Sequence, residues 1–117
     1  SVHEGPQRIT KSKNKKDAYL QAGMILSNEP GYYKSGEYGI RIENLIICSA
    51  KDKLSPKLLS FETISWAPID KELIKPSLLD KNEIQWLNNY HKKVYELISS
   101  KLNSSEKNWL KNVTNPI

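Results

Sequence analysis

The sequence predicts an α+β fold in which an antiparallel sheet is followed by a helical hairpin. Strand-forming residues and turn signals dominate the chain up to about residue 70, whereas apolar residues recur at helical spacing beyond that point. With 117 residues, of which 38% are hydrophobic and 26% charged, the chain has the composition of a soluble globular protein. This length supports one modest core and excludes a (β/α)₈ barrel or a two-domain enzyme.

The first predicted strand covers residues 22–28, with the sequence AGMILSN. Pro30 and Gly31 should end it, because proline lacks the backbone donor that a ladder needs and glycine permits unusual dihedral angles. Residues 32–39 contain two glycines and several polar residues, which predicts a loop or a hairpin connection. Two further strands are expected, at residues 39–50, which contain four isoleucines, and at residues 61–69.

The helical part should begin at Asp80, a good N-cap, with Glu83 three residues later completing a capping box. The apolar residues that follow at helical spacing are Ile84, Leu87, Val94, Leu97, Ile98 and Leu102. Ser104 or Ser105 is expected to cap a second, short helix. The Asn-Pro pair at residues 115–116 should end that helix.

Composition also excludes several classes of function. No apolar run approaches the roughly 18 residues that span a bilayer. The net charge of +5 comes mostly from lysines spread along the chain, and the densest run, residues 11–16, contains no aromatic residue for base stacking. The single cysteine, Cys48, cannot form an internal disulfide and is expected to be buried. We therefore expect a cytoplasmic protein that binds neither nucleic acid nor a membrane.

Two carboxylates are the main candidates for chemistry. Glu29 ends the first predicted strand and Glu43 lies within the second, so that pairing of these strands would direct both into one pocket. Carboxylates that close repel each other, and a divalent metal ion removes this penalty while using their hard oxygen atoms. Arg41 shares a strand face with Glu43 by period two. A structural ion pair on a solvated sheet face is the alternative, and the pattern alone favours it.

Two histidines and two tyrosines remain to be placed. His3 lies among apolar and acidic neighbours, and a lone histidine is more often structural than functional. His91 falls in the middle of the first predicted helix, where a surface or interface position is expected. Tyr32 and Tyr33 follow the Pro-Gly break, and at least one of them should pack or donate a hydrogen bond in a pocket.

Several motifs together resemble one family. They are VHEGP at residues 2–6, AGMI at 22–25, NEPGYY at 28–33, GIRIEN at 39–44 and WLNNYH at 86–91. In order and spacing they resemble aminopeptidase P, the Xaa-Pro aminopeptidase of the pita-bread (creatinase/aminopeptidase-like) metallopeptidases. The resemblance implies that residues 1–76 are the C-terminal part of the catalytic domain. Residues 77–117 then correspond to the C-terminal helical extension of the long cytosolic form.

The resemblance also implies a dinuclear site with two divalent metal ions, usually manganese, held by two aspartates, one histidine and two glutamates. Glu29 matches the first glutamate, which also acts as general base, and Glu43 matches the second, which bridges both metals. His3 matches a histidine that contacts the substrate and the tetrahedral intermediate. Arg41 matches an arginine that orients a ligand carboxylate, and Tyr33 matches a tyrosine on the active-site wall.

The two aspartates and the ligand histidine of the family belong upstream of Val2, so the sequence starts abruptly at the site and we expect it to be part of a longer protein. Alone it should be inactive. The complete enzyme would remove the first residue from peptides with proline in second position. A prolidase-like dipeptidase is one alternative. The other is a non-catalytic dimerisation module, since long members of the family form homodimers through their C-terminal part and the helices here carry Trp86, Tyr90 and Trp109.

Overall fold

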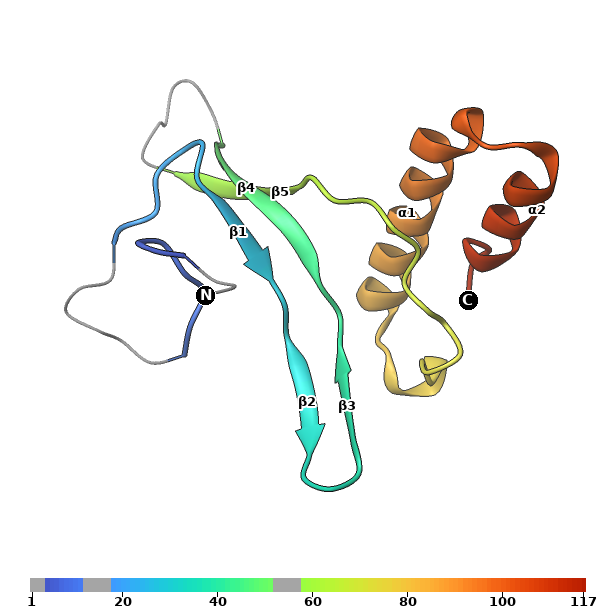
Figure 1. Ribbon diagram of the computed structural model, residues 1–117, viewed down its shortest axis with the longest axis horizontal. Helices are drawn as coiled ribbons and strands as arrows, with labels where there is room; N and C mark the ends of the chain where they lie inside the picture. Colours follow the sequence, from blue (N-terminus) through green and yellow to red (C-terminus); the bar gives the residue numbers. More distant parts are fainter. Residues whose placement is uncertain (1–3, 12–17, 52–57) are drawn as a thin grey trace. The chain divides into compact units, whose positions relative to one another are not determined.

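The computed structural model describes residues 4–11, 18–51 and 58–117 (Figure 1). They fall into two compact units, Ser1–Ser65 and Trp66–Ile117. All strands belong to the first unit and all helices to the second, which confirms the predicted α+β class. The predicted functional division at residue 76 stays a prediction.

Three strands of the first unit form an antiparallel sheet in the order β1-β4-β5. Their bounds are Ile25–Asn28 for β1, Asn44–Ala50 for β4 and Leu59–Thr63 for β5. The core of this unit consists of Leu26, Ile46 and Cys48, against which Leu20 and Met24 pack. Cys48 is therefore buried, as predicted.

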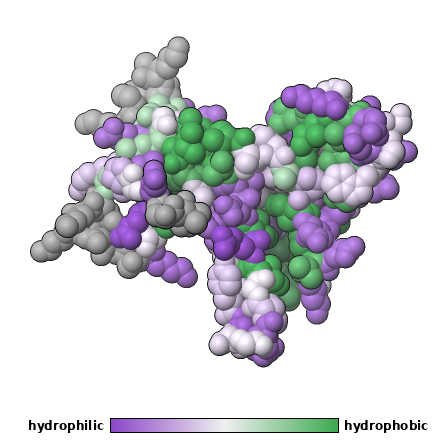
Figure 2. All heavy atoms as spheres, in the orientation of Figure 1, coloured by the Kyte–Doolittle hydropathy of each residue, from purple (hydrophilic) through white to green (hydrophobic). Residues whose placement is uncertain are grey.

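The other face of the sheet is less covered. Ile25 and Leu45, which lie on the face opposite Leu26, remain 49% and 43% exposed. Figure 2 shows hydrophobic side chains at the surface of this part of the chain. Among the described residues the sheet thus buries one apolar face and leaves apolar side chains of the other in contact with solvent.

The predicted connection at residues 32–39 is a hairpin of β2 (Gly31–Lys34) and β3 (Tyr38–Arg41). Gly36 supplies the positive φ, +72°, that its turn requires. The expected single strand at 39–50 is therefore wrong: it is divided into β3 and β4, which belong to different sheets.

Pro30 explains this division. Asn28 pairs with Asn44 and Gly31 with Arg41, so the two ladders keep one register across the gap. The amide of Ile42 still donates to the carbonyl of Pro30 at 3.2 Å, but proline has no N–H to return. One long antiparallel ribbon is thus interrupted where residues 29–30 face residues 42–43.

The third strand is shorter than predicted, because β5 ends at Thr63 rather than at residue 69. At Ser65 a side-chain oxygen takes the place of a backbone carbonyl, since Ser65 Oγ accepts a hydrogen bond from the amide of Leu45 at 2.8 Å. Beyond it, the amide of Ala67 donates to Tyr90 Oη at 3.4 Å and the amide of Ile69 to His91 Nε2 at 3.0 Å. Amides bonded to helix side chains are not available to a strand partner.

The second unit contains two α-helices and two 3₁₀ turns. Their bounds are Pro76–Leu78 for η1, Lys81–Ile98 for α1, Ser99–Lys101 for η2 and Ser104–Val113 for α2. Asp80 caps α1 as predicted, and Glu83 completes the capping box by accepting the amide of Asp80 at 2.8 Å. No helix in the part of the chain that the structure describes could cross a membrane.

The predicted cap of α2 is wrong by one or two residues. Asn103 is the N-cap, since its Oδ1 accepts the amide of Glu106 at 3.0 Å while Glu106 Oε2 accepts the amide of Asn103 at 3.0 Å. Ser104 and Ser105 lie between the two residues of this capping box and belong to the first turn of the helix.

The core of the second unit is built from Tyr90, Val94 and Leu110. The burial of Tyr90 corrects the expectation that it joins two exposed tryptophans, because only Trp86 and Trp109 are exposed, at 55% and 59%. Tyr90 instead donates its hydroxyl to the carbonyl of Ala67 at 2.8 Å.

His91 is also buried, with no exposed surface, and the expected surface position is wrong. Its Nε2 accepts the amide of Ile69, while Nδ1 has no hydrogen-bond partner within the described ranges. Burial, and secondly the charge of Lys71, lower the pKa of His91. The neutral ring is therefore part of the packing of this unit.

Candidate metal centre

The interruption of the ribbon brings the two candidate glutamates together. The shared register places Glu29 opposite Glu43, and both line one cavity of about 1050 Å³. Residues between Glu4 and Lys11 line the same cavity, and Gln7 anchors that segment by donating to the carbonyl of Ile25 at 3.2 Å. The predicted pairing of the two strands into one pocket is thus present.

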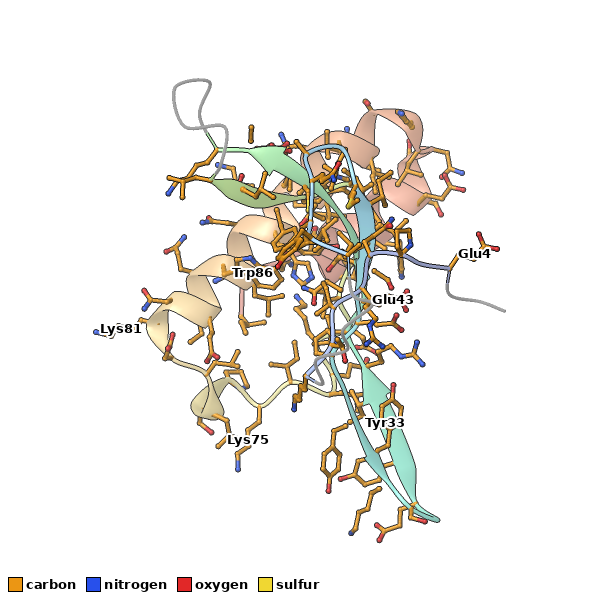
Figure 3. The ribbon with its side chains drawn as sticks, turned by 90° about the vertical axis from the view of Figure 1, so that its left-hand side faces the viewer. Glu4, Tyr33, Glu43, Lys75, Lys81 and Trp86 are labelled. Atoms are coloured by element: carbon orange, nitrogen blue, oxygen red, sulfur yellow. The ribbon has the colours of Figure 1, made fainter. Side chains whose placement is uncertain are left out.

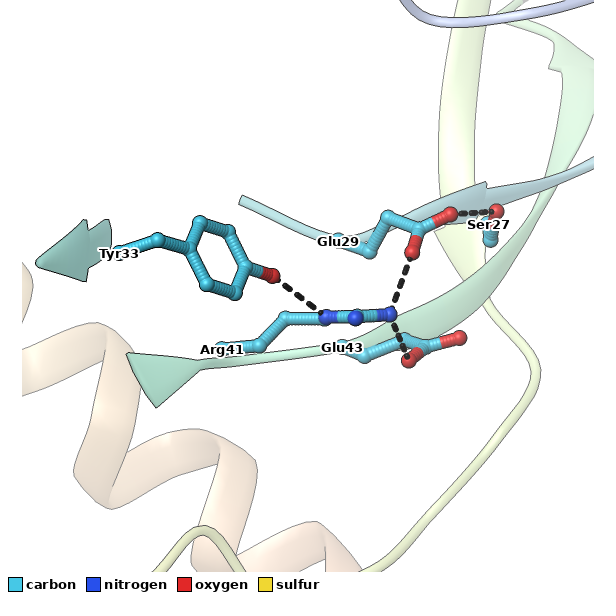
Figure 4. A network of polar contacts seen from close by, with 5 residues as sticks. All are labelled: Ser27, Glu29, Tyr33, Arg41 and Glu43. Atoms are coloured by element: carbon cyan, nitrogen blue, oxygen red, sulfur yellow. Dashed lines mark hydrogen bonds and ion pairs between the residues drawn. The ribbon is translucent and has the colours of Figure 1, made fainter. Parts of the chain in front are cut away.

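Arg41 connects both carboxylates (Figure 4). Its Nη1 lies 2.8 Å from Glu29 Oε2 and 3.6 Å from Glu43 Oε2. The structural ion pair that was the alternative interpretation is therefore also present. The guanidinium supplies the positive charge that two facing carboxylates need.

Tyr33 holds the other side of the guanidinium. Its hydroxyl oxygen accepts a hydrogen bond from Arg41 Nε at 2.9 Å. The contact with Tyr33 is the main cause that raises the pKa of Arg41, and the charges of Glu29 and Glu43 contribute less. Tyr33 lies along the β2–β3 hairpin and Glu43 at its base (Figure 3). The expected donation inside a pocket is wrong, because Tyr33 is 62% exposed, does not line the cavity and accepts through its oxygen.

Two glycines make room for the Tyr33 ring. A Cβ at Gly31 would lie 2.7 Å from Tyr33 Oη, and a Cβ at Gly39 would lie 2.7 Å from its Cδ1. Gly39 is the cross-strand partner of Tyr33, so its hydrogen leaves space for the ring to lie against the hairpin. The glycines thus allow the tyrosine to reach Arg41.

We expect Gly39→Ala to displace the Tyr33 ring and to break its bond to Arg41. The Nε–H of Arg41 should then exchange with solvent about 5- to 10-fold faster, because one hydrogen bond to a charged group is lost. Proton NMR of the arginine side chain measures this exchange, with Tyr33→Phe as the reference for a broken bond. Wild-type exchange in Gly39→Ala combined with fast exchange in Tyr33→Phe would contradict the role given to the glycine.

Ser27 is a contributor that the sequence analysis missed. Its Oγ donates to Glu29 Oε1 at 2.7 Å. The available signal was period two, since residues 27 and 29 share a face of an extended segment. Of the other predicted site residues, His3 lies outside the described residues.

A divalent metal ion suits the chemistry of this pair, because carboxylate oxygens are hard donors. Among residues 4–11, 18–51 and 58–117, no three His, Cys, Asp or Glu side chains lie close enough to hold a metal ion. The described residues therefore supply Glu29 and Glu43 as candidate ligands, and a complete coordination shell needs further donors.

Known proteins share this organisation. A family model described as the C-terminal region of peptidase M24 matches residues 57–117, and the model of metallopeptidase family M24 matches residues 1–50. Aminopeptidase P1 of Arabidopsis thaliana is 39% identical over 120 residues, which cover 99% of this chain and 19% of that protein. Xaa-Pro aminopeptidase 1 of Dictyostelium discoideum is 42% identical over 123 residues, covering 100% of this chain and 20% of that protein.

A solved structure agrees with the sequence matches. X-prolyl aminopeptidase from Caenorhabditis elegans, described as a cytosolic enzyme with a di-nuclear active site, superposes with a TM-score of 0.73 at 35% identity. The match covers 84% of this chain and 17% of that one, and it confirms the predicted aminopeptidase-like α+β fold. The chain spans about a fifth of the length of the curated relatives it matches. The chain therefore belongs to metallopeptidase family M24 and carries the C-terminal region of that family.

Proposed function

We propose that this chain forms part of the active site of an Xaa-Pro aminopeptidase, an enzyme that removes the first residue from peptides with proline in second position. The observation that carries the proposal is the pair Glu29 and Glu43, which face each other across an interrupted ribbon with Arg41 between them. Similarity over the whole chain to Xaa-Pro aminopeptidases supports the substrate class.

In this proposal Glu29 and Glu43 are ligands to two divalent metal ions, for which we propose manganese. When bound, the metals supply Lewis acidity and activate a water molecule as nucleophile. Glu29 accepts the proton of that water through its carboxylate. Arg41 fixes the direction of both carboxylates, and its bond to Tyr33 holds the guanidinium in place. His3 donates to the substrate carbonyl oxygen as negative charge develops there.

Peptide hydrolysis by the full-length polypeptide that contains this sequence tests the proposal. We expect release of the first residue from peptides of three or more residues with proline second, and none from matched peptides with alanine second. A prolidase-like activity would instead favour Xaa-Pro dipeptides over the longer peptides. If neither the longer peptides with proline second nor the Xaa-Pro dipeptides are cleaved when manganese is supplied, the proposed activity is overturned.

We expect the 117-residue chain alone to bind manganese weakly or not at all. Two carboxylates provide too few donors for a tight dinuclear site, and the guanidinium of Arg41 competes for both of them. Isothermal titration calorimetry of the isolated chain measures this. Tight binding of two manganese ions per chain would contradict the expectation.

We also infer that the complete enzyme is a cytoplasmic homodimer joined through its helical part, residues 77–117. The exposure of Trp86 and Trp109 supports this, because aromatic side chains are enriched in the cores of interfaces. Trp86 borders a shallow cavity of about 400 Å³ beside the start of α1. Sedimentation of the chain should show a concentration-dependent dimer that Trp86→Ala weakens, whereas a monomer at high concentration would count against it.

A further inference from the structure

Ser27 and Arg41 divide the carboxylate of Glu29 between them. Ser27 Oγ donates to Oε1 at 2.7 Å, and Arg41 Nη1 donates to Oε2 at 2.8 Å. Both distances are short, as expected for hydrogen bonds to an ionised acceptor. Because each oxygen accepts from a donor on a different strand, the two bonds restrain the rotation of the carboxylate as well as its position.

The two partners differ in how firmly they are held. Ser27 belongs to β1, and its neighbour Leu26 is buried in the core of the sheet. A serine side chain reaches its oxygen through a single rotatable bond with a few staggered positions, so few alternatives compete with the observed contact. Arg41, by contrast, is a long side chain that remains 45% exposed. The hydroxyl is therefore the more rigid of the two supports.

The two partners also differ in charge. A cation that binds Glu29 and Glu43 competes with the guanidinium, because like charges repel. The hydroxyl of Ser27 is neutral and can keep its bond to Oε1 while Oε2 faces a cation. Neutral groups of this kind orient metal ligands in many proteins, and their loss lowers metal affinity without removing a ligand.

We propose that Ser27 is a positioning residue that fixes the Glu29 carboxylate in the direction from which it ligates a divalent cation. The cation part of this inference rests on the proposed function. The contact between the hydroxyl and the carboxylate does not.

The first measurement uses the metal-free chain. Three-bond couplings measured by NMR report the side-chain rotamers of Glu29 in wild type, Ser27→Ala and Ser27→Thr. We expect averaged rotamers in Ser27→Ala and wild-type rotamers in Ser27→Thr, because threonine keeps the hydroxyl. Ser60→Ala is the matched control, since it removes a hydroxyl from β5 and should leave Glu29 unchanged.

The second measurement uses the full-length polypeptide and manganese as the probe, with free Mn²⁺ counted by electron paramagnetic resonance. Ser27→Ala should bind Mn²⁺ about 10- to 100-fold more weakly, and Ser27→Thr should restore most of the affinity. If wild type binds no Mn²⁺, the proposed function fails, and the rotamer measurement alone decides on Ser27. Unchanged Glu29 rotamers in Ser27→Ala, or a loss of affinity that threonine does not rescue, would overturn the proposal.

Discussion

In the full-length polypeptide, Glu43→Gln is expected to lower kcat/KM for Xaa-Pro peptides by at least about 100-fold. Glutamine keeps the shape of the side chain and removes the charge that a metal ligand provides. Glu29→Gln should lose at least as much, because Glu29 is proposed both to ligate a metal and to accept a proton. Initial rates together with the manganese content of each purified variant measure the effect, and both values should fall.

Glu37→Gln is the matched control for this pair. Glu37 lies in the turn between β2 and β3 and pairs with Lys34 at 2.7 Å on the exposed tip of the hairpin. Exposed pairs of this kind contribute little, so rate and metal content should stay within about twofold of wild type. If Glu37→Gln lost as much kcat/KM and manganese as Glu43→Gln, the losses would follow from the change in net charge and not from the loss of a metal ligand.

These two glutamates illustrate what the sequence could predict. The facing of Glu29 and Glu43 was predicted only on the condition that their strands pair, because alternating apolar residues and a Pro-Gly break indicate strands and their ends but not the register between them. The cap of α1 at Asp80, by contrast, is local, because the capping box needs only residues three apart. A prediction of this type is confirmed because all the residues that determine the feature lie in one short segment.

The errors have causes that lie in another segment. The strand at 39–50 is broken because Pro30, on the opposite side of the ribbon, provides no amide hydrogen. The strand from residue 61 ends early because side chains of α1 take the amides of Ala67 and Ile69. Helical spacing does place His91 on the buried stripe of α1, between Leu87 and Val94. What this spacing could not show is the partner of its ring, the distant amide of Ile69.

Below neutral pH, the helical unit is expected to lose stability as His91 takes up a proton. Its Nε2 accepts the amide of Ile69 and can no longer do so once it carries a hydrogen. Burial first, and the charge of Lys71 second, lower the pKa of His91 in the folded chain. The ammonium of Lys71 stays nearby, since it donates to the carbonyls of Asn112 and Asn115 at 3.4 and 2.6 Å.

The direction of the effect follows from proton linkage. Because the folded pKa of His91 lies below the unfolded value of 6.5, the unfolded chain binds more protons between these two values. The stabilisation is complete above pH 6.5 and decreases as the pH falls toward the folded pKa. The free energy of unfolding should fall by at most about 1.4 kcal/mol per pH unit in this window. Urea unfolding followed by circular dichroism between pH 7.5 and about 5.5 covers the range before most carboxylates titrate.

The two histidines of the chain provide the controls for this prediction. His91→Gln offers an oxygen to the Ile69 amide and does not titrate, so its unfolding free energy should be nearly independent of pH in this window, apart from the contribution of His3. His3→Gln should keep the wild-type dependence. Hydrogen exchange of the Ile69 amide gives a local measure, because its protection should fall in parallel with stability in wild type and not in His91→Gln. A pH dependence that survives in His91→Gln and disappears in His3→Gln would assign the effect to the other histidine and refute the role of the buried ring.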